Sequence, residues 1–263
     1  MEDVVVRVLE KVELKDPVLI VGLPGLGNVA KLAADYLKEA IGATKFVTIY
    51  SKYFPPQVYV NESGMIRMVS NDLYYYKAKT PEERNLLILV GDYQGISPEG
   101  QYELTDKVLS LVSGMGVRQV FTLAGFAQGH MVENPRVIGA ATSNSLIEKM
   151  KKLGVVFARN EPGSGLIGAS GLFLGLGELY KMESICLMGE TSGYFVDPRS
   201  AEAVLRILLK TFNMDVDLSD LEAKAKEIDR IASRLRETEA KLVTDTPSTG
   251  GPSQPKEDLG YIG

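Results

Sequence analysis

Two glycine-rich turns are the parts of this sequence best suited to chemistry. Gly25-Leu-Gly-Asn-Val-Ala30 and Gly163-Ser-Gly-Leu-Ile-Gly168 fit the pattern G-x-G-x-x-G/A, which lets a backbone approach the phosphates of a dinucleotide. Each turn lies between a predicted strand and a predicted helix, as such a site requires. An acidic residue, Glu190, ends the strand that follows the second turn, whereas the first turn has no such residue. The second turn therefore predicts a nucleotide or nucleoside site made by Gly163, Gly165, Gly168 and Glu190, although such turns more often serve close packing.

Other catalytic motifs are missing from the sequence. It contains neither a G-x-x-x-x-G-K-[ST] phosphate loop nor a G-x-S-x-G nucleophile elbow. Its single histidine, His130, is predicted on a surface loop, and its single cysteine, Cys186, lies inside an apolar run. One cysteine cannot form an internal disulfide or a cysteine-based metal site. Outside the glycine turns, we therefore expect no catalytic residue, no metal ligand and no cofactor.

The composition is that of an ordinary globular protein. The chain has 263 residues, of which 45% are hydrophobic and 24% charged. A net charge of −5 and the lack of a basic tract argue against nucleic acid as a partner. The most apolar stretch has about 14 apolar and small residues, fewer than the roughly 20 that cross a bilayer. The first residues also lack the features of a signal peptide, so we expect a cytoplasmic protein without a membrane partner.

Short β-branched runs alternate with helical patterns along most of the chain. This alternation predicts one α/β domain over residues 1–216, with a single mixed, mainly parallel sheet flanked by helices on both faces. One segment differs, because residues 53–76 have an antiparallel pattern. Within it, residues 58–60 and 65–69 predict a hairpin around a turn at Asn61 to Gly64.

The helix predicted from about Leu166 to Tyr180 has almost no polar side. Such a pattern is typical of a helix that is covered all round. Gly168, Gly171 and Gly175 fall on one side of it, where a bare backbone permits very close packing. We therefore expect this helix to be central in the fold.

The C-terminal part of the chain has a different character. Residues 217–243 predict a charged amphipathic helix, which Ser219 and Glu222 open as a capping box. Its apolar seam is narrow, and we expect it to pack on a neighbouring surface. The seam consists of Leu218, Leu221, Ala225, Ile228, Ala232, Leu235 and Leu242.

Residues 244–263 predict a flexible tail, because they are rich in proline, glycine, serine and threonine. Apolar residues return at its tip, which consists of Leu259, Gly260, Tyr261, Ile262 and Gly263. An apolar tip on a flexible tether is suited to binding a partner. The alternative is that the tip docks on its own domain.

Four motifs in this order resemble the archaeal homologues of the proteasome-assembly chaperones, over about Val4 to Leu242. They are Gly22-Leu-Pro-Gly-Leu-Gly-Asn28, Tyr53-Phe-Pro-Pro56, Glu161-Pro-Gly-Ser-Gly-Leu-Ile-Gly-Ala-Ser-Gly171 and Glu190-Thr-Ser-Gly-Tyr-Phe-Val-Asp-Pro198. The resemblance implies a fold like that of nucleoside phosphorylases, without an established enzymatic activity. It also implies that the nucleotide-like turns are inherited architecture.

The resemblance further implies a use for the tail. Proteasome activators and assembly factors insert C-terminal tails, which end in a hydrophobic residue, tyrosine and any residue, between α-subunits of the core particle. Here Tyr261 is third from the end and Ile262 is penultimate, which departs from that pattern. The resemblance implies that Tyr261 acts as the hydrophobic member or shifts register, with the Gly263 carboxylate contacting a basic group.

The sequence therefore predicts a non-enzymatic, ring-like homo-oligomer that binds the proteasome core particle as an assembly chaperone or activator. Binding would use the C-terminal segment, and several tails on one oligomer would add avidity. One alternative is a nucleotide- or nucleoside-binding enzyme that uses the Gly163–Gly168 turn. Another is a scaffold whose C-terminal helix only builds the oligomer.

Overall fold

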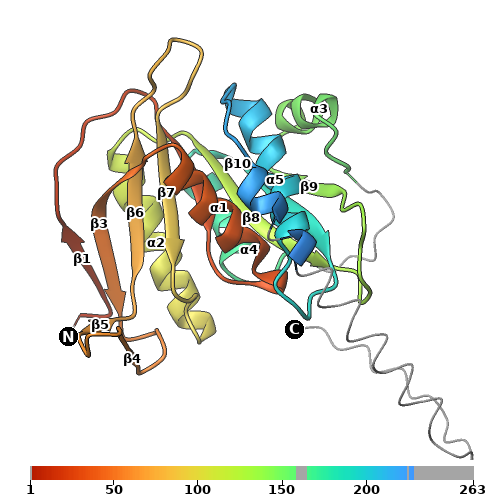
Figure 1. Ribbon diagram of the computed structural model, residues 1–263. Helices are drawn as coiled ribbons and strands as arrows, with labels where there is room; N and C mark the ends of the chain where they lie inside the picture. Colours follow the sequence, from red (N-terminus) through yellow and green to blue (C-terminus); the bar gives the residue numbers. More distant parts are fainter. Residues whose placement is uncertain (1, 158–164, 224, 228–263) are drawn as a thin grey trace, which may run out of the picture.

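The computed structural model describes residues 2–157, 165–223 and 225–227, and these ranges form a layered α/β fold (Figure 1). An eight-stranded sheet runs through this part of the chain. In spatial order its strands are β1 (Val4–Val8), β3 (Thr44–Ser51), β6 (Asn71–Tyr76), β7 (Leu86–Gly91), β2 (Val18–Gly22), β8 (Gln119–Ala127), β10 (Glu183–Thr191) and β9 (Val137–Ala141). The α/β class and the single large sheet are confirmed.

The sheet is mixed, and the expectation that it is mainly parallel is not confirmed. The four strands β7, β2, β8 and β10 run parallel at its centre. The outer pairs β1–β3, β3–β6, β6–β7 and β10–β9 are antiparallel, so the described sheet has three parallel and four antiparallel pairings. For β3, β6 and β7 the reason is that no helix crosses over between them, so β6 runs back beside β3 and β7 runs back beside β6.

Helices cover both faces of the sheet. Helices α1 (Val29–Ala40) and α5 (Pro198–Phe212) contact each other on one face, where α3 (Asn144–Lys152) joins the same core. Helices α2 (Pro98–Gly114) and α4 (Ala169–Leu179) contact each other on the opposite face. Strands β2 and β7 are buried along their whole length because both of their faces are covered. No helix in the described ranges has the length and apolar character needed to span a membrane.

Helix α4 is not covered all round, which corrects the expectation drawn from its sequence. Phe173 and Gly177 are buried, but Gly175 is exposed and the side chain of Leu179 is 77% exposed. Gly168 is the N-cap residue and so precedes the helix. The prediction was wrong because α4 lies on the outside of the sheet beside α2, so one side of it meets no other part of the described chain.

The predicted C-terminal helix has begun by Ser219, but the expected capping box is not formed. The backbone N–H and the hydroxyl of Ser219 donate to the carboxylate of Asp217, and the carboxylate of Glu222 accepts from Arg206.

Residues 219–223 are helical, and the first seam residues, Leu218, Leu221 and Ala225, are buried. Leu218 and Leu221 join the core that contains α1 and α5. This confirms packing on the domain for the start of the seam, whereas Ile228 and the seam residues after it lie outside the described residues.

A small separate hairpin completes the fold. Strands β4 (Val58–Val60) and β5 (Ile66–Met68) pair antiparallel with each other, as the sequence predicts. The hairpin leaves the sheet after β3 and returns into β6, and it lies at the lower end of the molecule in Figure 1.

Candidate functional site

The loops that follow β2, β7, β8 and β10 meet at one end of the sheet. This is where open α/β sheets bind ligands, because the carboxyl ends of their parallel strands converge there. The first glycine turn, the start of α4 and Glu190 all lie at this end. The site is therefore best judged by what these groups already contact.

The first glycine turn serves close packing. A Cβ atom at Gly22 would lie 2.1 Å from the Cβ of Ala34, so β2 touches α1 at this point. A Cβ atom at Gly27 would lie 2.6 Å from Oγ1 of Thr191, and Gly27 has a φ of +60° inside the short 3-10 helix η1 (Leu26–Asn28). These glycines bring helix, strand and loop together and leave no room for a phosphate between them.

The side chain of Gln94 occupies the space at the start of α4, beside the second glycine turn. Its Nε2 donates to the Pro24 carbonyl at 2.7 Å, and its Oε1 accepts from the backbone N–H of Ala169 at 2.9 Å. That N–H belongs to the first residue of α4, where a bound phosphate would also find its donors. The cavity lined by Gln94, Ala169 and Phe173 measures about 10 Å³, which is about the space of one water molecule. The described residues therefore leave no nucleotide-sized space at this helix start.

Both carboxylate oxygens of Glu190 accept hydrogen bonds from other protein groups. Its Oε1 accepts from Nε2 of Gln128 at 2.9 Å and from the guanidinium of Arg136, while Oε2 accepts from Nε of Arg136 at 2.9 Å and from the Arg136 backbone N–H at 3.1 Å. The hydrogen bond from the Arg136 side chain holds the pKa of Glu190 below its ordinary value despite burial. The carboxylate therefore stabilises the loop before β9, and no oxygen is left over for a ribose.

Those residues of the predicted nucleotide site that the structure describes do not share a contact. Gly168 lies against the side chain of Gln94, which follows β7, whereas Glu190 faces Arg136 and Gln128. Gly165 lies in an exposed loop, and Gly163 lies outside the described residues. His130 is exposed, as predicted, with its Nδ1 2.9 Å from the Gln128 carbonyl. In the described ranges no three His, Cys, Asp or Glu side chains are placed to hold a metal ion.

The predicted partner-binding residues, Leu259, Gly260, Tyr261, Ile262 and Gly263, lie outside the described residues. What the described residues do offer for binding is apolar surface, which the sequence analysis missed. Most of their exposed large apolar side chains lie at the same end of the sheet as the loops above. They are Leu26, Val58, Tyr59, Val60, Met65, Ile66, Met68, Ile96, Tyr102, Ile167, Tyr194, Phe195 and Val196.

The hairpin carries the densest part of this surface. Val58 pairs with Met68 and Val60 with Ile66, and these four side chains point to one side, 46–69% exposed. Tyr59 and Arg67 form the remaining cross-strand pair and point to the other side. The period-two pattern Val-Tyr-Val and Ile-Arg-Met was the signal in the sequence for such a two-sided hairpin.

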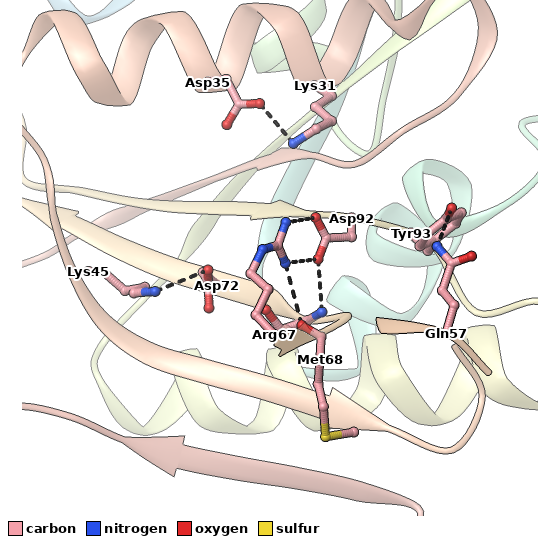
Figure 2. A network of polar contacts seen from close by, with 10 residues as sticks. Lys31, Asp35, Lys45, Gln57, Arg67, Met68, Asp72, Asp92 and Tyr93 are labelled. Carbon is pink, nitrogen blue, oxygen red and sulfur yellow. Dashed lines mark hydrogen bonds and ion pairs between the residues drawn. The ribbon is translucent and has the colours of Figure 1, made fainter. Parts of the chain in front are cut away.

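The side of the hairpin with Tyr59 and Arg67 is fastened to the domain. Figure 2 shows the guanidinium of Arg67 beside the carboxylate of Asp92, with contacts of 2.6 and 3.0 Å. Burial raises the pKa of Asp92, but hydrogen bonds from Arg67 and from the Ser70 backbone N–H outweigh it and hold that pKa below its ordinary value. The Arg67 guanidinium also lies 4.4 Å from the ring centre of Tyr59.

A second apolar group follows β10. Tyr194, Phe195 and Val196 are consecutive, and their side chains are 78%, 60% and 48% exposed. The loop that carries them is held by a hydrogen bond of 2.8 Å from the Asp197 N–H to the Gly27 carbonyl. The exposed side chains thus stand on a loop that is fixed to the first glycine turn.

Comparison with known proteins identifies the family of the chain. A model of the PAC2 family matches residues 19–236. The uncharacterized protein MJ1210 of Methanocaldococcus jannaschii is 34% identical over 264 residues, which cover 100% of this chain and 99% of that protein.

Solved structures agree with the sequence matches. The crystal structure of Pyrococcus furiosus PbaB, an archaeal proteasome activator, has a TM-score of 0.85 and is 35% identical, covering 90% of this chain and all (100%) of that chain. Pyrococcus furiosus PbaA, an archaeal homolog of proteasome-assembly chaperone, is 24% identical with a TM-score of 0.73, covers 91% of this chain and 94% of that chain, and shows the fold alone. These matches confirm the resemblance drawn from the four motifs, and the chain belongs to the PAC2 family.

Proposed function

We propose that this protein binds the proteasome core particle in the cytoplasm, as an activator or assembly chaperone, and does not itself catalyse a reaction. The observation that carries the proposal is the likeness to PbaB, a protein described as a proteasome activator. At 35% identity over the whole of that chain, the two proteins share sequence as well as fold. A shared partner is the simplest inheritance from such a common origin.

The contacts at the carboxyl ends of the strands support a binding protein over a nucleotide-dependent enzyme. Gln94 occupies the first free N–H of α4, and the oxygens of Glu190 are taken by Arg136 and Gln128. A site that bound a nucleoside would need such groups to be free, together with a cavity of about 300 Å³ or more. Exposed apolar side chains are what a protein-binding surface needs instead.

We assign core-particle binding to the C-terminal segment, and in particular to Leu259, Gly260, Tyr261, Ile262 and Gly263. This assignment rests on the sequence and the family, because the segment lies outside the described residues. Docking between α-subunits would bury the apolar side chains of the tip. A homo-oligomer, ring-like in the form we propose, would present several tips, and tips of modest affinity would then act together once the first is bound.

The test compares three chains in binding to purified archaeal core particles. They are the full chain, a chain that ends at Asp258, and a chain in which Tyr261 and Leu259 exchange places. We expect the full chain alone to bind, because the rearranged tip keeps the composition but moves the tyrosine away from its place near the C-terminus. Equal binding by all three would refute the role of the tip and move the contact to the folded domain.

Peptide hydrolysis by the core particle, measured in the same mixtures, separates the two forms of the proposal. An activator raises hydrolysis by mature core particles, whereas an assembly chaperone leaves it unchanged and instead speeds the formation of core particles from free subunits. A full chain that neither binds nor alters either reaction would contradict the proposed function as a whole.

A further inference from the structure

We propose that residues 228–232 continue the C-terminal helix past the start of α5, where they cover Phe195 and Val196 and place an acidic side chain against Arg199. The inference goes beyond the proposed function, since it identifies the surface of the domain from which the tail departs. It is argued from contacts of the described residues and is tested without the proteasome, so the two proposals can fail separately.

The described start of the C-terminal helix runs antiparallel to α5. Leu218 lines a groove together with Asn213, the residue that caps the end of α5. One turn later, Oε1 of Glu222 accepts from the guanidinium of Arg206 at 2.7 Å, in the middle of α5. Ala225 then lies beside the first residue of α5. A helix that continues in this direction reaches the loop before α5, at the carboxyl ends of the parallel strands.

The charges of the two helices share one register. The faces of an α-helix recur nearly every seven residues, so seven residues forward in one helix correspond to seven residues back in an antiparallel neighbour. From the contact between Glu222 and Arg206, this step leads to Asp229 on the C-terminal helix and to Arg199 on α5. The observed ion pair therefore predicts a second one, between the carboxylate of Asp229 and the guanidinium of Arg199.

The groove beside this contact has the charges that the register requires. Its volume is about 400 Å³, and its lining includes Arg199 and Glu202 of α5 together with Lys226 of the C-terminal helix. Lys226 follows Glu222 by four residues, as Glu202 precedes its partner on α5 by four. Acidic and basic residues therefore alternate in opposite phase on the two helices, which favours this segment of the chain as the occupant.

The apolar seam of the helix leads to an uncovered apolar surface. Ala225, the last described residue of the seam, is buried and lines a cavity of about 20 Å³ with Phe195 and Val196. The side chains of Phe195 and Val196 are 60% and 48% exposed. Ile228 is the next residue of the seam, about 4.5 Å further along the axis of a continuing helix. In the proposed arrangement its side chain covers both, and the tail leaves the domain at this end of the sheet.

The first experiment exchanges the two charges and measures amide hydrogen exchange in residues 225–232 of the full chain. The variants are Asp229→Arg, Arg199→Asp and the double variant that carries both changes. Glu227→Arg is the control, because it makes the same change of charge at an exposed position of the same helix. Circular dichroism establishes that all of the chains are folded.

We expect each single reversal to speed exchange in this segment about three-fold, because two like charges then face each other. The double variant should return the exchange toward the native rate, and Glu227→Arg should leave it unchanged. A double variant that exchanges as fast as the single variants would overturn the pairing. So would a control that has the same effect as Asp229→Arg.

A fluorescent probe then identifies what covers the loop. The chain has no tryptophan, so Phe195→Trp introduces a single indole there. In this background we expect Ile228→Asp to shift the emission to longer wavelength, as water reaches the indole, and Tyr261→Asp to have no effect. A shift with Tyr261→Asp alone would assign the cover to the tip of the tail and overturn the inference. An emission that changes with protein concentration but with neither variant would assign the cover to another molecule and overturn it as well.

Discussion

Glu190 illustrates at the scale of one residue why a promising motif need not be a catalytic site. Its position after a strand and a glycine turn is that of a ribose-binding carboxylate. Its neighbours decide otherwise, because Arg136 and Gln128 lie within hydrogen-bond distance of both oxygens. A buried carboxylate that is satisfied in this way contributes to stability, and the contribution depends on its charge.

We predict that Glu190→Gln lowers the free energy of unfolding by about 1–2 kcal/mol at neutral pH, because an amide turns a donor toward Arg136. The folded-state pKa of Glu190 is lowered, so its stabilisation is complete above the ordinary pKa of a glutamate and is lost as pH falls through the lowered value. In urea titrations the difference between native and variant chains should therefore shrink in acid. Glu178→Gln, at an exposed position of α4, is the control, and a difference independent of pH would contradict the assignment.

The glycines of the first turn act at the scale of the element, because they decide how closely β2 and α1 approach. A Cβ atom at Gly22 would lie 2.1 Å from the Cβ of Ala34 and 2.6 Å from the carbonyl oxygen of Ala30, so the helix must move. Gly114, at the end of α2, has nothing within 4 Å of an added Cβ atom. The same substitution should therefore have opposite effects at the two positions.

We predict that Gly22→Ala lowers the free energy of unfolding by about 1–3 kcal/mol through overpacking. Gly114→Ala should instead raise it by about 0.5 kcal/mol, because it reduces the conformational freedom of the unfolded chain. Chemical denaturation of both variants measures the two changes. If Gly22→Ala were as stable as the native chain, close packing would not be the role of this glycine.

The ion pair between Arg67 and Asp92 fastens the hairpin to the domain, and this contact gives a further prediction for the element. Arg67→Ala should increase amide hydrogen exchange in residues 58–68, because the contact with Asp92 is lost. The side chain of Arg67 is 58% exposed, so global stability should change by less than about 1 kcal/mol. Lys45→Ala is the matched control, since its contact with Asp72 is longer, at 3.5 Å, and lies outside the hairpin. Unchanged exchange in the hairpin would show that other contacts hold it.

The elements also show which features a sequence can predict. The β4–β5 hairpin was predicted correctly, because its signals are local turn residues and spacing. The C-terminal helix was predicted to start near Ser219, but its capping box was wrong, because Asp217 accepts the hydrogen bonds that Ser219 donates. The exposure of α4 was not predicted, because burial depends on which element packs alongside. A helix with an exposed apolar side has the same sequence pattern as a helix that is buried on all sides. The antiparallel character of residues 53–76 was predicted, but the sheet as a whole was expected to be mainly parallel, since strand direction depends on how each connection returns.

At the scale of the whole molecule, the sequence was most informative through the order of its motifs. The four motifs pointed to the family, which the match over residues 19–236 confirms. Single residues of the nucleotide motif were less informative. The start of α4, where a phosphate was expected, is occupied by Gln94. That residue is distant from both glycine turns in the sequence and belongs to no recognisable motif. Likeness of the fold to nucleoside phosphorylases stays a prediction.

The whole molecule is organised as a scaffold with an apolar end. The core is formed on both faces of one sheet, and most of the exposed large apolar side chains of the described residues lie near the carboxyl ends of its parallel strands. Such an arrangement suits a protein whose work is to hold other chains. The proposed function assigns contact with the proteasome to the C-terminal tail.

The most direct test of the central claim is sedimentation of the full chain mixed with purified archaeal proteasome core particles. We predict that the chain moves with the core particle and that an excess of a free peptide with the sequence of the last five residues displaces it, because both would occupy the same pockets. A chain that sediments alone at every concentration of core particle would contradict the account.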